Sequence, residues 1–270
     1  MKTLKLFKTA TSLSALLCLC MKLVHPAFGQ QPQIIKTLHA EEADQGVATD
    51  AHFIYAINNS TIGKYDRITG QRVAVWQGDP ALYVHINSCQ SHTGQLVCAM
   101  SNFPYVPMTS SVEFFDPRTM THIKSHSFGP GRGSLTWIDW HDNSWWACFA
   151  NYDGEGQDGG RTHAATVLVR MSEQFEERGA WLFPEAVLDR IQPFSVSGGR
   201  WNQDGFLYVT GHSRPEMYVL TLPEAGGRLQ YIRTIPMATN GQAFDWDYQY
   251  PGVIWSIQRK TRDVVESRLP

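Results

Sequence analysis

The side chains of this sequence that could transfer a proton are histidines and carboxylates scattered along the chain. His212 is closely followed by Arg214 and Glu216, and Asp153 precedes a second histidine, His163. A positioned imidazole or carboxylate can act as a general acid or base. His212, Glu216 and Asp153 are therefore candidate catalytic residues, with the alternative that Arg214 and Glu216 pair with each other.

No short motif identifies a reaction. The sequence has no Gly-x-Ser-x-Gly nucleophile elbow, no His-Glu-x-x-His zinc motif, no phosphate-binding glycine loop and no EF-type calcium loop. Imidazole and carboxylate suit zinc or a related divalent metal. The residues that could supply them are His85, His163, His212, Asp44 and Asp153. No local spacing groups these five, so we expect no cofactor and leave a divalent metal open.

A repeated segment indicates the fold that would position such residues. Five apolar runs each end at a polar residue, and their starts lie 43, 49, 61 and 47 residues apart. In register they read FIYAINN (53–59), LVCAMSN (96–102), WWACFAN (145–151), FLYVTGH (206–212) and VIWSIQR (253–259). Periods of this size in a β-rich chain are typical of propeller blades, because one unit cannot bury its apolar face alone.

A predicted strand precedes each run and another follows it, and in the first two units a fourth strand follows at 71–77 and 120–128, which gives four strands per unit. The strands before the runs are 46–50, 85–90, 135–140, 197–201 and 242–247, and those after them are 61–66, 111–116, 166–171, 216–222 and 262–267. The fifth unit lacks its own fourth strand, and a free β segment at 34–40 precedes the first unit. The sequence thus predicts an all-β fold: a single β-propeller of five four-stranded blades, closed by this N-terminal strand. Two stacked β sandwiches are the alternative, and 184–191 is the one expected helix.

The repeat also predicts where a site would lie. In a propeller, the loops after the second strands and the connections between blades open on the same face, at one mouth of the central channel. The loops of blades two and three reach their third strand after 10 and 16 residues, against 3 to 5 elsewhere. Long loops on a rigid scaffold concentrate binding residues, although the blade-three loop could be a solvent loop without a role. The candidate ligand-binding residues are Gln45, Asn59, His85, Asn87, Asn102, Tyr105, Asn151, Tyr152, His163, Ser197, Arg214, Gln242 and Arg259.

The N-terminus is built like a secretory signal peptide. Lys2, Lys5 and Lys8 precede an apolar stretch at 9–21, and Ala27-Phe28-Gly29 offers small residues for cleavage after Gly29. The stretch has 13 residues, too few for a membrane span of about 20. We therefore predict a signal peptide at 1–29, a propeller domain at 30–270, no transmembrane segment in the mature chain, and a periplasmic or secreted protein. A lipid anchor at Cys18 or Cys20 is the alternative.

Charge and cysteine content narrow the partners further. Loss of residues 1–29 removes four lysines and no acid, which moves the formal net charge from −2 to −6 and argues against nucleic acid as a partner. We expect a monomer that binds a small polar ligand or a peptide. Cys89 and Cys98 are equidistant from the turn at Thr93 and Gly94 and would face each other as a disulfide in an oxidising compartment. Cys148 is expected to be a core thiol.

Tryptophans are frequent enough to suggest an aromatic platform for sugars. They include Trp137, Trp140, Trp145, Trp146, Trp181, Trp201, Trp246 and Trp255. Most fall at strand positions that face neighbouring blades, so we expect them to pack between blades.

Several longer strings resemble a group of exported bacterial propeller proteins that are commonly labelled cycloisomerase. The strings are QGVATD, KYDRITG, CAMSNFPYVP, SSVEFFD, SLTWIDWHD, WWACFANYDG and LYVTGHSRPEMYVLTLP, and the resemblance covers nearly all of 34–270. It implies a propeller fold without specifying an activity.

A weaker resemblance is to five-bladed propellers of the glutaminyl cyclase type. It rests on QGVATD, on the turn formed by Tyr65, Asp66, Thr69 and Gly70, and on YVTGHSRPEMYVL. Where that family places a Glu-Ser-Thr-Gly string with its catalytic acid, this sequence has Ala56-Ile57-Asn58-Asn59. The resemblance therefore supports five blades and does not support that family's chemistry.

The resulting hypothesis is an exported propeller that binds a small polar ligand at one mouth of the channel, as a cyclase, isomerase or lyase using acid–base chemistry. The alternative is a non-catalytic module that recognises a peptide or a cell-envelope partner through the same loops.

Overall fold

Each repeated apolar run forms the second strand of a four-stranded antiparallel sheet in the computed structural model, which describes residues 31–270. These strands are β3 (Phe53–Asn58), β7 (Gln95–Ser101), β11 (Ser144–Ala150), β15 (Leu207–Thr210) and β19 (Val253–Gln258). Both faces of a second strand pack against neighbouring blades, so its residues read as a continuous apolar run and not as an alternation. In β11 every residue is buried. The proposed signal peptide at 1–29 lies outside the described residues.

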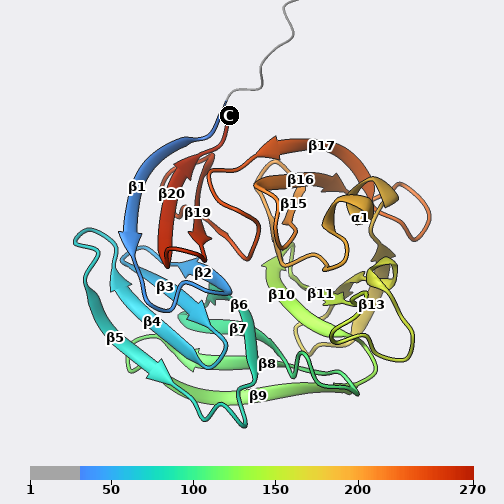
Figure 1. Cartoon of the computed structure of the whole chain (residues 1–270), viewed down its shortest axis with the longest axis horizontal. Helices are drawn as coiled ribbons and strands as arrows, with labels where there is room; N and C mark the ends of the chain where they lie inside the picture. The colour runs from blue at the N-terminus through green and yellow to red at the C-terminus, as the bar shows by residue number, and fades with distance from the viewer. Residues whose placement is uncertain (1–30) are drawn as a thin grey trace, which may run out of the picture. The chain divides into compact units, whose positions relative to one another are not determined.

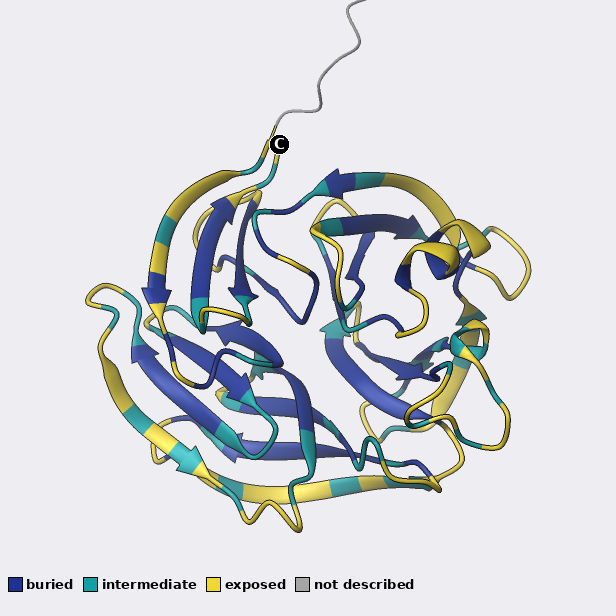
Figure 2. Cartoon of the chain, viewed as in Figure 1, coloured by how far each residue is buried: buried dark blue, intermediate teal, exposed yellow. Residues whose placement is uncertain are grey.

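Five sheets are arranged in a ring, as the sequence predicted (Figure 1). Blade 1 contains β2 (Gly46–Thr49), β3, β4 (Thr61–Asp66) and β5 (Arg72–Gln77); blade 2 contains β6 (His85–His92), β7, β8 (Thr109–Asp116) and β9 (Thr121–Pro130). Blade 3 contains β10 (Ser134–His141), β11, β12 (Val167–Met171) and β13 (Glu177–Leu182); blade 4 contains β14 (Gly198–Trp201), β15, β16 (Glu216–Thr221) and β17 (Gln230–Pro236). Among the strands, the outermost ones carry nearly all of the exposed residues (Figure 2).

The fifth blade is completed by the N-terminal strand, as predicted. Strand β1 (Gln33–His39) pairs antiparallel with β20 (Asp263–Arg268), and the sheet runs in the order β1, β20, β19, β18. Leu38 of β1 packs in the apolar cluster between blades 5 and 1, together with Trp255 and Val264. This pairing leaves β20 no free edge.

The innermost strand of blade 5 is shorter than predicted. Strand β18 covers Asp245–Trp246, whereas the sequence indicated 242–247. The amide of Ala243 donates to the carbonyl of Gln45 in blade 1 (3.2 Å), and the carbonyl of Gln242 accepts from Oγ1 of Thr210 in blade 4 (2.7 Å). These residues bond to neighbouring blades and therefore do not extend the ladder with β19.

Apolar clusters fill the spaces between blades. Trp137 and Trp146 of blade 3 pack with Tyr218 of blade 4, and helix α1 (Glu185–Ile191) covers this cluster with Val187, Leu188 and Ile191. Trp145 and Trp255 are also buried in clusters between blades. Packing between blades therefore accounts for these tryptophans. Of the helices in the described part of the chain, none has the length and hydropathy that a membrane span requires.

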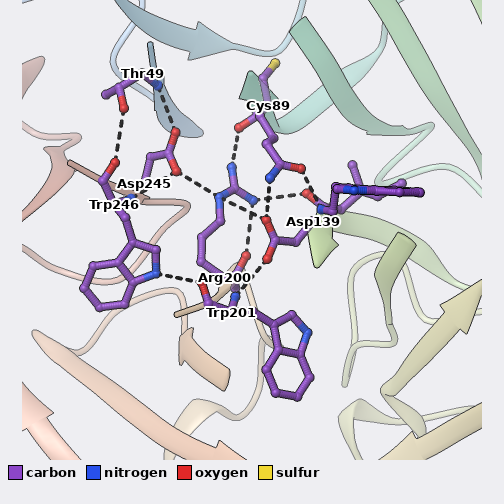
Figure 3. A network of polar contacts seen from close by, with 11 residues as sticks. Thr49, Cys89, Asp139, Arg200, Trp201, Asp245 and Trp246 are labelled. Carbon is purple, nitrogen blue, oxygen red and sulfur yellow. Dashed lines mark hydrogen bonds and ion pairs between the residues drawn. The ribbon is translucent and has the colours of Figure 1, made fainter. Parts of the chain in front are cut away.

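The innermost strands are joined at the centre by a buried ionic network around Arg200 (Figure 3). Nε of Arg200 lies 3.1 Å from Oδ1 of Asp245, and Nη1 donates to the carbonyl of Ile138 (3.1 Å). The guanidinium also donates to the carbonyl of Cys89 in β6, while Asp245 accepts from the amide of Thr49 in β2 (2.9 Å). One arginine of β14 thus connects residues of all five blades.

The predicted disulfide is present. Cys89 of β6 and Cys98 of β7 are directly paired in register and bonded to each other. Cys148 is a free, buried thiol, as expected.

Candidate functional site

A cavity of about 100 Å³ opens at the mouth that the repeat predicted. Its walls come from residues that follow the second strands and residues that begin the blades. It is lined by Gln45, His85, Asn87, Phe103, Thr136, Tyr152, Phe194, Ser197, His212, Gln242 and Arg259. All five blades contribute, because each blade repeats the same approach to the central channel.

Arg259 is the electrostatic centre of this mouth cavity. Its Nη1 lies 2.9 Å from Nε2 of His212, and its Nε lies 3.3 Å from Oδ1 of Asp44. Arg262 reaches the same Asp44 oxygen at 2.7 Å. Two guanidinium groups therefore share one carboxylate.

Both histidines of the cavity are neutral at physiological pH. Burial, followed by the positive charge of Arg259, lowers the pKa of His85 and of His212 to about 4. The ring of His212 stacks on Phe194, with centroids 4.0 Å apart, and its Nδ1 lies 2.9 Å from Oγ of Ser213. A guanidinium has only donors, so Nε2 of His212 accepts from Arg259 and Nδ1 carries the proton.

An aromatic wall closes one side of the cavity. Phe103, which begins the long loop of blade 2, lies with its ring centroid 5.3 Å from His85 and 4.8 Å from Tyr152. Phe103, Tyr152 and the buried Met108 form a small apolar cluster. The two long loops therefore pack on each other and supply the wall.

The structure brings eight of the predicted site residues into the lining of the cavity. They are Gln45, His85, Asn87, Tyr152, Ser197, His212, Gln242 and Arg259. Asn59 does not line the cavity but contacts a residue that does: its Oδ1 accepts a hydrogen bond from Nε2 of Gln45 (3.0 Å).

Other predicted residues hold the surrounding loops. Nδ2 of Asn102 donates to the carbonyl of Pro107 (3.1 Å) and its Oδ1 accepts from the amide of Thr109 (2.8 Å). Nδ2 of the buried Asn151 donates to the carbonyl of Ala165 (3.1 Å). Neither asparagine lines the cavity, so of Asn102, Asn151 and His212, which occupy equivalent blade positions, His212 alone does. Tyr105 is 65% exposed.

The two candidate catalytic carboxylates lie outside the cavity lining. Oδ2 of Asp153 lies 2.6 Å from Nδ1 of His163, at the start of the 3-10 helix η1 (His163–Ala165). Burial alone would raise the pKa of Asp153, but hydrogen bonds from His163 outweigh it and lower that pKa.

Glu216 and Arg214 do not pair with each other. Glu216 forms an ion pair with Arg190 and accepts from the hydroxyl of Tyr218 (2.9 Å). The hydrogen bond from Arg190 lowers the pKa of Glu216. Arg214 donates through Nε to the carbonyl of Arg190 (3.0 Å).

Residues 31–270 contain no group of three or more histidine, cysteine or acidic side chains placed to hold a metal ion. Of the side chains that could have supplied such a site, Asp153 is bound to His163 and Asp44 to two arginines.

Three lining residues were not among the sequence candidates. Phe103 and Phe194 contribute aromatic faces, and Thr136 lies on β10. Phe103 lies two residues after the end of the second strand β7, and Phe194 lies four residues before the start of β14. The rule that selected polar residues at these positions would have found both phenylalanines if it had included aromatic ones.

Two larger hollows lie on the opposite face. One, of about 510 Å³, lies between blades 2 and 3 and is lined in part by His92, Trp140 and Phe175. The other, of about 400 Å³, is lined in part by Gln203 and Tyr248. We favour the smaller mouth cavity as the functional site because polar side chains of all five blades converge on it.

No protein-family model and no curated protein sequence matches this chain. Among solved structures, it is similar to the PQQ-bound form of the aldose sugar dehydrogenase of Streptomyces coelicolor, with a TM-score of 0.54, 10% identity, and coverage of 89% of this chain and 98% of that one. It is also similar to a luciferin-regenerating enzyme, with a TM-score of 0.51, 8% identity, and coverage of 89% and 90%. At such identities the likeness shows the fold alone, a β-propeller.

Proposed function

We propose that this chain is an exported propeller that binds a small polar ligand in the mouth cavity. The observation that supports this most is the convergence of an arginine and two neutral histidines from three different blades on one small cavity. The five large apolar clusters between the blades contain none of the residues that line this cavity, so apolar packing does not account for the polar cluster. The volume of about 100 Å³ fits a small molecule better than a peptide.

Export is supported by the Cys89–Cys98 disulfide. Such bonds persist in oxidising compartments and are rare in the cytosol. We place the mature protein in the periplasm or outside the cell.

Acid–base catalysis on the bound ligand is the second part of the proposal. An imidazole with a pKa of about 4 is unprotonated at neutral pH, so His85 and His212 can accept a proton there. Cyclase, isomerase and lyase reactions that proceed by acid–base catalysis use a proton acceptor positioned beside the substrate. We assign this role to His212, with His85, which also lines the cavity, as the second candidate.

The test is a thermal-shift screen of the mature protein with hydroxy acids, lactones, sugar acids and glutaminyl peptides. A ligand that binds only the folded state raises the melting temperature by mass action. Ser197→Leu fills the cavity and should abolish the shift, whereas Gln203→Leu, at the hollow of the opposite face, should retain it.

The reverse pattern would place the site on the opposite face. A ligand that shifts the melting temperature and is never converted would favour a binding module, and His212→Asn should abolish any conversion that is found.

A further inference from the structure

The side chains that line the mouth cavity carry an excess of positive charge. Arg259 is the one charged side chain among the eleven lining residues, since no aspartate or glutamate lines the cavity and burial keeps both histidines neutral. The side chain of Arg259 is 35% exposed, and a partly buried charge that is incompletely balanced attracts an opposite charge. The cavity therefore favours a ligand that brings a negative charge.

The nearest carboxylate does not remove this imbalance. Asp44 is shared by Arg259 at 3.3 Å and Arg262 at 2.7 Å. Two cations on one anion leave an excess of one positive charge. Within the described residues, Nη2 of Arg259 has no hydrogen-bond partner, while Nε and Nη1 are engaged. A guanidinium with a spare donor is suited to a carboxylate.

The amide side chains at the cavity complement a different group. Nε2 of Gln45 donates to Asp44 (3.2 Å) and to Asn59 (3.0 Å). Nε2 of Gln242 donates to the carbonyl of His212 (3.4 Å). Both amide nitrogens are engaged by the protein, whereas neither amide oxygen has a hydrogen-bond partner within residues 31–270, so the oxygens can accept hydrogen bonds from hydroxyl groups.

We propose that the ligand of this cavity is a small hydroxylated monocarboxylate. Its carboxylate binds Arg259 and balances the excess charge, and its hydroxyl groups donate to Oε1 of Gln45 and of Gln242. A cavity of about 100 Å³ limits it to a few heavy atoms. This inference rests on the proposed function, since it names the ligand class of the same site.

The carboxylate also competes with His212 for the guanidinium. In the unliganded protein Nη1 of Arg259 donates to Nε2 of His212. A carboxylate that binds the spare Nη2 together with Nη1 takes the place of His212 at Nη1, neutralises the charge beside the ring and leaves Nε2 of His212 free to accept a proton. Binding of the ligand carboxylate would thus make Nε2 of His212 available as the proton acceptor.

The experiment compares three probes by calorimetric titration of the mature protein. Glycerate has the carboxylate and the hydroxyls, glyceramide replaces the carboxylate by a neutral amide, and propionate lacks the hydroxyls. We expect glyceramide and propionate each to bind at least about tenfold more weakly than glycerate, as loss of one charged or buried hydrogen bond predicts. Arg259→Gln should abolish the preference for glycerate over glyceramide, and Arg259→Lys should retain part of it.

Arg178→Gln is the matched control, because it removes one exposed positive charge that pairs with Glu176 outside the mouth cavity. It should leave glycerate affinity unchanged. In the wild type, NMR titration should show the pKa of His212 rising when glycerate binds.

Equal binding of glycerate and glyceramide at this cavity would overturn the carboxylate inference and leave the proposed function standing. Absence of glycerate binding, when Ser197→Leu blocks only screened molecules that lack a carboxylate, would also overturn it. If Ser197→Leu blocks no molecule of the screen, the proposed function itself fails.

Discussion

Nη1 of Arg259 in blade 5 and Nε2 of His212 in blade 4 lie 2.9 Å apart, although the two residues are separated by 47 positions in the chain. The contact crosses the boundary between two blades at the mouth of the channel. It requires the neutral imidazole, because a protonated ring would place a second proton and a like charge against the guanidinium.

Protonation of His212 should therefore destabilise the fold. Its pKa is about 4 in the folded chain and about 6.5 when unfolded. Between these values the unfolded chain binds more protons, so the free energy of unfolding falls as the pH decreases from about 6.5 towards 4. Because the ring is partly exposed, we expect His212 to account for about 1 kcal/mol between pH 7 and pH 5. Urea unfolding at both pH values measures this loss.

His212→Asn isolates that contribution. Buried carboxylates such as Asp139 act in the opposite direction, so the pH dependence of the wild type alone is not diagnostic. Between pH 7 and pH 5, the free energy of unfolding of the variant should fall by about 1 kcal/mol less than that of the wild type. Identical losses in the two proteins would show that His212 titrates normally.

Disruption of the Arg200 network at the centre of the ring should lower the free energy of unfolding by more than this. Arg200, Asp139 and Asp245 are 2%, 3% and 8% exposed. Arg200→Met leaves both carboxylates buried without their cation and should cost about 3 to 5 kcal/mol near pH 7. Adding Asp139→Asn and Asp245→Asn should recover part of this cost.

The cost of Arg200→Met should also shrink at lower pH. Burial raises the pKa of Asp139 to about 7 and that of Asp245 above its usual range, against the attraction of Arg200. Without Arg200 both pKa values rise further, so the folded variant takes up protons more readily than the unfolded chain, and its stability increases as the pH falls. Denaturant unfolding near pH 7.5 and near pH 5 measures the change. A cost that is the same at both pH values would contradict a charge-based role.

The architecture was predictable from the sequence because the five second strands are buried on both faces. Burial on both sides requires continuous apolar runs such as WWACFAN, and these runs recur every 43 to 61 residues in the sequence. The short strand at Asp245–Trp246 was not predictable, because Gln242 and Ala243 are fixed by bonds to other blades.

The position of the mouth cavity was predictable from the sequence, but the contacts around it were not. The repeat located His212 and Arg259 at one mouth, because equivalent positions of the blades surround one axis. It could not show that Asn102 and Asn151 turn back to their own loops. It also could not show that Arg190, which lies on helix α1, engages Glu216. These contacts depend on the conformations of the long segments that connect the strands, including helix α1, and a repeat does not determine those conformations.

The disulfide should be present in protein isolated from the periplasm or the medium. Intact-mass measurement should find the mature chain two hydrogens lighter than its fully reduced form, with Cys148 as the free thiol. The double variant Cys89→Ala and Cys98→Ala should lower the free energy of unfolding by about 2 to 3 kcal/mol, since the bond closes a loop of 9 positions. Three reactive thiols in the unfolded, unreduced protein would exclude the bond.

Closure of the ring by β1 gives the last prediction. Removal of residues 31–40 exposes the edge of β20 and takes Leu38 from the cluster that also contains Trp255 and Val264. An open edge and an incomplete core should make the mature protein aggregate, or lower its melting temperature by on the order of 10 °C. A synthetic peptide of residues 31–40, added in trans, should restore solubility and most of the melting temperature by adding back the missing strand. The same peptide with Leu38→Asp should restore neither. A truncated protein that melts like the wild type would show that the ring does not depend on this strand.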